Sequence, residues 1–88
     1  MTKYKVSEVS QDITSSTTLV PEKKYGGWFA VNQGVSAAKI IGYDVQPGEG
    51  IDMRKAVPAG SMWGSPIQII VGAGGLVRIT RLQYMEMK

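Results

Sequence analysis

The side chains most often used as a general base or as a thiol nucleophile are absent, because the 88 residues include no His and no Cys. Among the seven acidic residues, Glu49 and Asp52 lie on either side of a turn, where a carboxylate pair or a weak Ca²⁺ site is conceivable. The turn Pro47–Gly50 matches no EF-hand spacing, so solvated carboxylates are the plainer interpretation. Structural zinc lacks its thiolate or imidazole ligands. We therefore expect a protein that is not an enzyme and that holds no cofactor and no metal.

The glycine-rich segment Gly72-Ala73-Gly74-Gly75 invites comparison with a phosphate-binding loop. Such a loop presents backbone N–H groups at the start of a helix, and its dinucleotide version needs a G-x-G-x-x-G spacing. Here the third glycine is missing, and the β pattern Leu76–Ile79 follows. The segment therefore predicts a tight hairpin.

Three aromatic residues, Trp28, Phe29 and Trp63, have the chemistry of a stacking platform for sugars or bases. In a domain of this size, tryptophans more often fill the core, since each buries a large area. Trp63 lies between Gly60 and Pro66 in a loop-like stretch, so it is the better candidate for exposure and for a ligand or interface role.

The positive charge is modest and scattered. Ten Lys and Arg against seven Asp and Glu give a net charge of +3. Lys39, Arg78 and Arg81 are candidates for a basic stripe, but the spacing puts Arg78 and Arg81 on opposite faces of a regular strand. A nucleic-acid-binding domain usually concentrates its charge more, which argues against nucleic acid as the partner. No segment approaches the roughly 20 apolar residues of a membrane span, and the N-terminus lacks an apolar signal-peptide core.

The elements that must position these residues are short strands. Runs that alternate apolar and polar residues recur every 8 to 12 residues between Gly and Pro turns, and helical periodicity is nearly missing. We predict an all-β fold, a small antiparallel β-sandwich or barrel of jelly-roll type with six to seven short strands. The clearest predicted strands cover Gly27–Val31, Lys39–Val45, Ile51–Arg54, Ile67–Val71 and Leu76–Tyr84.

The composition divides the chain near residue 25. Residues 1–24 are predicted to be a polar N-terminal arm or edge strand, and residues 25–88 the β core. A domain this small has a low free energy of unfolding. Because the composition excludes disulfides and a structural zinc site, oligomerisation is the remaining way to raise its stability. The candidate interface residues share exposed or adaptable apolar side chains; they are Leu19, Val20, Met62, Trp63, Met85 and Met87.

From Trp28 onward, about two-thirds of the chain resembles small β-rich virion proteins of tailed bacteriophages, of the capsid-decoration, head-fibre and tail-accessory kinds. The similar segments are Phe29–Asn32, Gly42–Glu49, the Pro58–Pro66 loop with Trp63, and Ile67–Val71 with the glycine turn into Val77–Ile79. The resemblance implies a non-enzymatic component present in many copies, a trimer by preference. Its N-terminal arm would reach toward a capsid or a neighbouring subunit. The resemblance transfers no functional residues.

The sequence thus predicts a structural or interaction module that self-associates and contacts other virion or scaffold proteins. Its place would be the virion, with the host cytoplasm as the site of assembly. Two alternatives stay open. One is an oligonucleotide-binding barrel of the OB or SH3-like kind, and the other is a carbohydrate-binding module that uses Trp63.

Overall fold

The computed structural model describes residues 3–22, 24–57 and 62–87, with the backbone alone described at residues 3, 4 and 85–87. Residues 58–61, at the start of the predicted Pro58–Pro66 loop, lie outside the described residues. The elements are β1 (Lys3–Ile13), β2 (Thr17–Leu19), β3 (Tyr25–Asn32), β4 (Ala38–Ile40), β5 (Tyr43–Val45), β6 (Gly50–Asp52), the 3-10 turn η1 (Arg54–Ala56), β7 (Ile67–Val71) and β8 (Val77–Met87).

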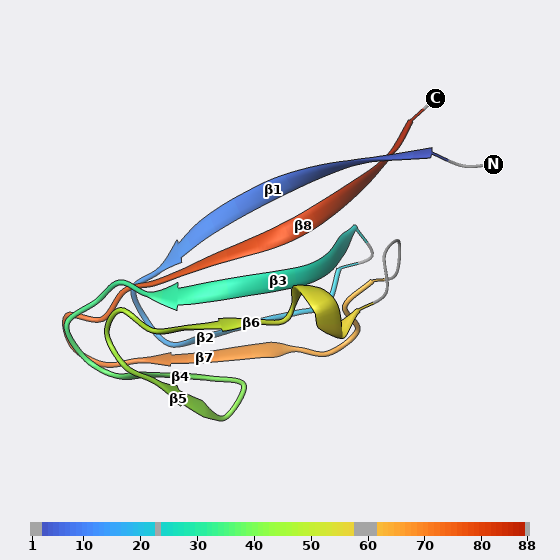
Figure 1. The fold of residues 1–88 in the computed structure, drawn as a ribbon. Coiled ribbons are helices and arrows are strands. Elements are labelled where there is room, and N and C mark those ends of the chain that lie inside the picture. The colour runs from blue at the N-terminus through green and yellow to red at the C-terminus, as the bar shows by residue number, and fades with distance from the viewer. Residues whose placement is uncertain (1–2, 23, 58–61, 88) are drawn as a thin grey trace.

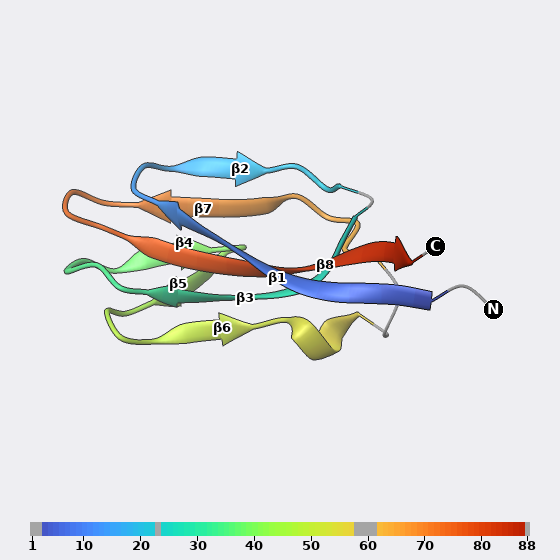
Figure 2. The same cartoon turned by 90° about the horizontal axis from the view of Figure 1, so that it is seen from above.

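The strands form two antiparallel four-stranded sheets in the nested order of a jelly roll. One sheet has the order β1-β8-β3-β6 and the other the order β2-β7-β4-β5 (Figures 1 and 2). The first strand pairs with the last, the second with the seventh, the third with the sixth and the fourth with the fifth. This wrapping of a long double strand into two packed sheets is the jelly-roll architecture. The predicted all-β sandwich is confirmed, with eight strands in the described residues where six to seven were predicted.

The core lies between the two sheets and draws side chains from both. Trp28 and Ile79 of the first sheet and Ile40 and Ile69 of the second are fully buried. Burying side chains of this size contributes roughly 1.5–3 kcal/mol each, which is the main stabilising contribution in a small domain. Ile13 at the end of β1 belongs to the same cluster. The packed core therefore includes a residue from the segment that composition set apart as an arm.

Two turns follow local sequence chemistry to different degrees. Gln46–Glu49 is the predicted Pro-Gly turn, with Gly48 at φ 86° and the Glu49 N–H donating to the Gln46 carbonyl over 2.9 Å. The prediction of a single strand over Lys39–Val45 is wrong, because this segment forms a hairpin in which β4 pairs with β5. Its two turn residues, Ile41 and Gly42, have φ of 45° and 86°. Positive φ at both positions is the type I′ pattern, which an Ile seldom adopts.

The glycine-rich segment after β7 is a tight turn, but the predicted hairpin is wrong. The Gly75 N–H donates to the Gly72 carbonyl over 3.0 Å, and the chain then leaves one sheet and enters the other. The turn packs against the loop after β3, where a Cβ on Gly34 would lie 2.4 Å from the Leu76 nitrogen. Two backbones can approach this closely only where a side chain is absent.

The longest strands are β1 and β8, which pair over 11 residues each. Pairing of β3 with β8 ends at Tyr25 and Gln83, so β1 and β8 continue past that point as a two-stranded ribbon (Figure 1). The molecule measures 47 × 19 × 18 Å, and this ribbon gives it its length.

Candidate functional site

Three of the six predicted interface residues meet at one end of the sandwich. Val20 (67% exposed), Met62 (38% exposed) and the partly buried Trp63 line neighbouring hollows there. Leu19 is partly buried against the core instead. The backbones of Met85 and Met87 lie in the ribbon opposite Lys5 and Lys3, and their side chains are outside the described residues.

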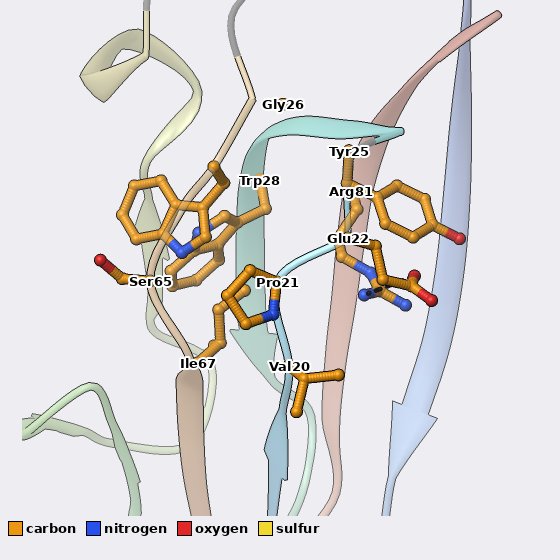
Figure 3. Close-up of a pocket in the computed structure, with 10 residues that line it drawn as sticks. Val20, Pro21, Glu22, Tyr25, Gly26, Trp28, Ser65, Ile67 and Arg81 are labelled. Carbon is orange, nitrogen blue, oxygen red and sulfur yellow. Dashed lines mark ion pairs between the residues drawn. The ribbon is translucent and has the colours of Figure 1, made fainter.

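A small cavity and a wider groove adjoin each other at this end. The cavity has a volume of about 10 Å³, close to the space of one water-sized group. In the view of Figure 3, Pro21 lies between Trp28 on one side and Arg81 on the other. The groove has a volume of about 280 Å³. Pro21, Glu22 and Trp63 line both hollows, and the groove adds Met62 and Gly64 while the cavity adds Tyr25, Trp28 and Arg81.

Three buried N–H donors on the cavity-lining residues have no acceptor among the described residues. They are Nε1 of Trp28, Nε1 of Trp63 and Nε of Arg81. An unsatisfied buried donor costs about 1–3 kcal/mol. Three of them are a large cost beside the roughly 5–15 kcal/mol of a whole domain. All the buried side-chain donors that lack an acceptor among the described residues therefore belong to residues that line this cavity.

The two tryptophans pack edge to face, with ring centroids 5.5 Å apart and an interplanar angle of 88°. This is the arrangement that aromatic quadrupoles prefer. Trp28 is fully buried, while Trp63 is tied down by its backbone N–H, which donates to the Tyr25 carbonyl over 2.9 Å. Trp63, which we expected to be exposed, is thus partly buried. It packs against the core and also lines the groove.

Arg81 is held by groups that sequence reasoning did not single out. Its guanidinium carbon lies 4.0 Å from the Tyr25 ring centroid, a cation–π contact. Nη1 lies 3.8 Å from Glu22 Oε2, and Nη2 donates to Gln11 Oε1 over 3.3 Å. Its buried Nε has no acceptor among the described residues. The spacing predicted that Arg81 lies on the opposite face from Arg78, but no local signal linked it to Tyr25 or Glu22.

Each cation of the candidate basic stripe has an acidic partner. Arg78 Nε donates to Asp12 Oδ1 over 2.8 Å, Lys39 Nζ lies 3.7 Å from Asp44 Oδ1, and Arg81 pairs with Glu22. Arg78 and Arg81 lie on opposite faces, as predicted. A phosphate backbone would have to compete with these carboxylates.

The two carboxylates considered for a metal site serve separate turns. Glu49 Oε1 accepts from the Gln46 N–H over 2.9 Å, while Asp52 receives hydrogen bonds from Arg54. The Arg54 side-chain and backbone donors lower the pKa of Asp52 from 3.8 to about 2. The Arg78 side chain lowers the pKa of Asp12 in the same way. In the described residues, no group of three or more acidic side chains gathers as a metal site would require.

A second candidate interaction surface is the outer edge of β1. Within residues 3–22, 24–57 and 62–87, no segment pairs with this edge, since β1 is the end strand of its sheet. The other end strands, β2, β5 and β6, have three residues each. Val6 of β1 is 52% exposed. A long strand edge with unpaired N–H and C=O groups is a template for pairing with another chain.

Comparison with family models, with curated proteins and with solved structures gives no match. The described part of the chain contains no helix with the length and apolarity of a membrane span.

Proposed function

We propose that this chain is a non-catalytic structural module that self-associates through the outer edge of β1 and serves as a multi-copy virion component. The free edge of β1 is the observation that carries the proposal. Along its eleven residues, the outward-pointing backbone groups of alternate residues pair with no other described segment, and part of the strand extends beyond the sandwich in the ribbon with β8. Strand addition to such an edge supplies affinity through main-chain hydrogen bonds.

The jelly-roll strand order supports the virion role by analogy of fold alone. Viral capsid domains and lectin domains share this architecture. Because one fold hosts many functions, the assembly surface and not the fold carries the argument. The resemblance of the sequence to small phage virion proteins points the same way, and it favours a capsid-decoration or head or tail accessory protein.

The geometry of the contact restricts the copy number. Pairing of β1 with β1 of a second copy is isologous and gives a dimer. Pairing of β1 with a different edge of the next copy is heterologous, and it gives a ring of three or more copies where the rotation closes and an open filament where it does not. We favour the trimeric ring, in line with the resemblance.

The alternative functions have weaker support. Nucleic-acid binding would need free cations, whereas Lys39, Arg78 and Arg81 are each paired with an acid. Carbohydrate binding would use the Trp63 groove, and the lectin analogy keeps it as the second candidate.

Native mass spectrometry of the full chain over a hundredfold concentration range tests the proposal. The expected result is one defined oligomer that dissociates on dilution. A monomer at every concentration would overturn self-association. Tight single-strand DNA or RNA binding at physiological salt would replace it with the nucleic-acid function.

A further inference from the structure

Val6 presents both its backbone and its side chain at the outer edge of β1. It lies opposite Tyr84 of β8, and the Tyr84 N–H donates to the Lys24 carbonyl over 2.8 Å, away from β1. Val6 and Tyr84 therefore form a non-hydrogen-bonded pair, in which the Val6 N–H and C=O point away from β8. The register of β1 is unbroken from Val6 to Ile13, an odd number of positions later, so these two side chains lie on opposite faces of the sheet. Because Ile13 packs in the core, the 52% exposed Val6 side chain lies on the outer face.

The other end strand of the same sheet, β6, borders a hollow on that outer face. The hollow has a volume of about 220 Å³ and is lined by β3 and β6. Phe29 and Val31 alternate with the buried Trp28 and Ala30, so their side chains point to the outer face. Gly50 lies opposite Val31 and brings no side chain to fill the space. A larger residue does not fit there, because a Cβ on Gly50 would lie 2.6 Å from the Ala30 carbonyl oxygen.

Gly50 also turns its backbone groups outward. The Met53 N–H donates to the Trp28 carbonyl over 2.8 Å, so Met53, and Ile51 two residues before it, turn their groups toward β3. Because these directions alternate along a strand, Gly50 and Asp52 turn theirs away from β3. No described segment pairs with this edge, since β6 is an end strand. The edge of β6 therefore combines outward backbone groups with an unfilled hollow beside them.

The edges of β1 and β6 run in directions that let them pair with each other in two copies. Every neighbouring pair in this four-stranded sheet is antiparallel, so its end strands β1 and β6 run in opposite directions. Rotation about an axis parallel to the strands preserves these directions, and it brings β1 of one copy antiparallel to β6 of the next. We propose that β1 of one copy adds to β6 of the next copy, with Val6 opposite Gly50 and its side chain in the hollow. This inference rests on the proposed self-association and names the surface that receives β1.

An exposed apolar side chain on one edge and a hollow on the other favour this heterologous contact over pairing of β1 with β1. Pairing of two β1 strands leaves the hollow beside Gly50 open, whereas addition of β1 to β6 fills it with Val6. Filling the space above an edge glycine with a side chain from the neighbouring strand is an established way to fix strand register. Since β6 has only three residues, few main-chain hydrogen bonds form, and burial of Val6 supplies much of the affinity.

Two variants, each blocked on one side of the contact, test this pairing by sedimentation equilibrium. Val6→Lys charges the β1 edge, and Val31→Glu places a carboxylate in the hollow, where the opposite residue Arg78 can pair with it. Each variant alone should associate at least about tenfold more weakly than the natural protein. An equimolar mixture should associate at least about tenfold more tightly than either variant alone, because one variant supplies an intact β1 edge and the other an intact hollow. Val35→Glu, at an 84% exposed loop position, is the matched control and should associate as the natural protein does.

An NMR titration gives a second readout that does not depend on the folding of Val31→Glu. When nitrogen-15-labelled Val6→Lys is titrated with unlabelled natural protein, the amide signals of Gly50 and Asp52 should shift saturably. If these signals stay in place, or if Val31→Glu associates as the natural protein does while Val6→Lys does not, β1 pairs with another surface. This inference is then wrong, while the proposed self-association through β1 stands. A natural protein that is monomeric at every concentration would overturn both.

Discussion

Asn32 is the residue on which the far end of the sandwich depends. It is fully buried at the end of β3, where its Nδ2 donates to the Ser36 carbonyl over 2.8 Å and to the Val45 carbonyl over 2.9 Å. Its Oδ1 accepts from the Gly34 N–H over 3.0 Å. One amide thus ties β3 of the first sheet to the loop that leaves it and to β5 of the second sheet.

Replacement of this amide by an acid should be costly. In Asn32→Asp, the Ser36 and Val45 carbonyls lose their donor and face a carboxylate, so we expect a loss of at least about 2 kcal/mol in the free energy of unfolding. Gln33→Glu makes the same chemical exchange on the exposed neighbour and should change stability by less than about 0.5 kcal/mol. Urea unfolding of both variants measures the difference. Equal effects would show that the Asn32 hydrogen bonds contribute little.

Asp52 should make the fold sensitive to acid. Its pKa is lowered to about 2 in the folded protein from an ordinary 3.8, chiefly by the Arg54 side chain. A lowered folded-state pKa contributes stability that is complete above about pH 4 and is lost as the pH falls through about 2. In an NMR titration of carboxyl signals, the pKa of Asp52 should be near 2, and it should rise toward its ordinary value in Arg54→Gln, which removes the side-chain donors and keeps the backbone N–H. Titration near 3.8 in both proteins would contradict this assignment.

At the scale of elements, β1 contributes to the core and is also the end strand of its sheet. Its end near β2 places Ile13 in the core, 5% exposed, while Val6, seven residues earlier, is 52% exposed. The same strand therefore packs into the core at one end and carries an exposed apolar side chain, Val6, toward the other. Removal of residues 1–20 would remove β1 and β2, one end strand from each sheet, together with Ile13.

Truncation of two side chains on this strand separates the two roles. Ile13→Ala should lower the free energy of unfolding by about 2–4 kcal/mol, because it leaves a cavity in the core. Val6→Ala should lower it by less than about 1 kcal/mol, since the exposed side chain buries little. Thermal unfolding under conditions that keep the protein monomeric is the measurement. A similar small loss in both variants would mean that β1 packs as a detachable arm.

The alternation of apolar and polar residues made the fold class predictable from the sequence. The turns were only partly predictable. The conformation of the Pro47-Gly48 turn follows from its residue types, since Pro fixes φ and Gly tolerates positive φ. That of the Ile41-Gly42 turn does not, because Ile is unfavourable at positive φ and holds it here while packed against the core. Strand pairing between residues far apart, such as Asp12 with Arg78, leaves no local signal at all.

The candidate site was less predictable than the fold. Val20, Met62 and Trp63 were expected to be interface residues from their apolar character and loop context. Their assembly beside Arg81 depends on how the segment after β2 crosses the end of the sandwich, which the sequence pattern does not reveal. The unpaired N–H groups appear only when the side chains are packed in three dimensions.

The whole molecule is a jelly roll with a ribbon at one end. Three of its four end strands are three residues long, which limits pairing with other chains, and the fourth is β1 with eleven. The long edge, to which no described segment pairs, and the ribbon lie on the same strand pair (Figure 1). This asymmetry is what we expect of a subunit that uses β1 in each contact with a neighbour.

Sedimentation equilibrium of matched variants tests this account most directly. Val6→Lys places a charge on the β1 edge, the device by which natural edge strands resist pairing. Val35→Lys makes the same substitution at an 84% exposed position in the loop between β3 and β4. We predict that Val6→Lys weakens self-association by at least about tenfold, roughly 1.4 kcal/mol, while Val35→Lys associates as the natural protein does. Equal association of all three proteins would contradict assembly through β1.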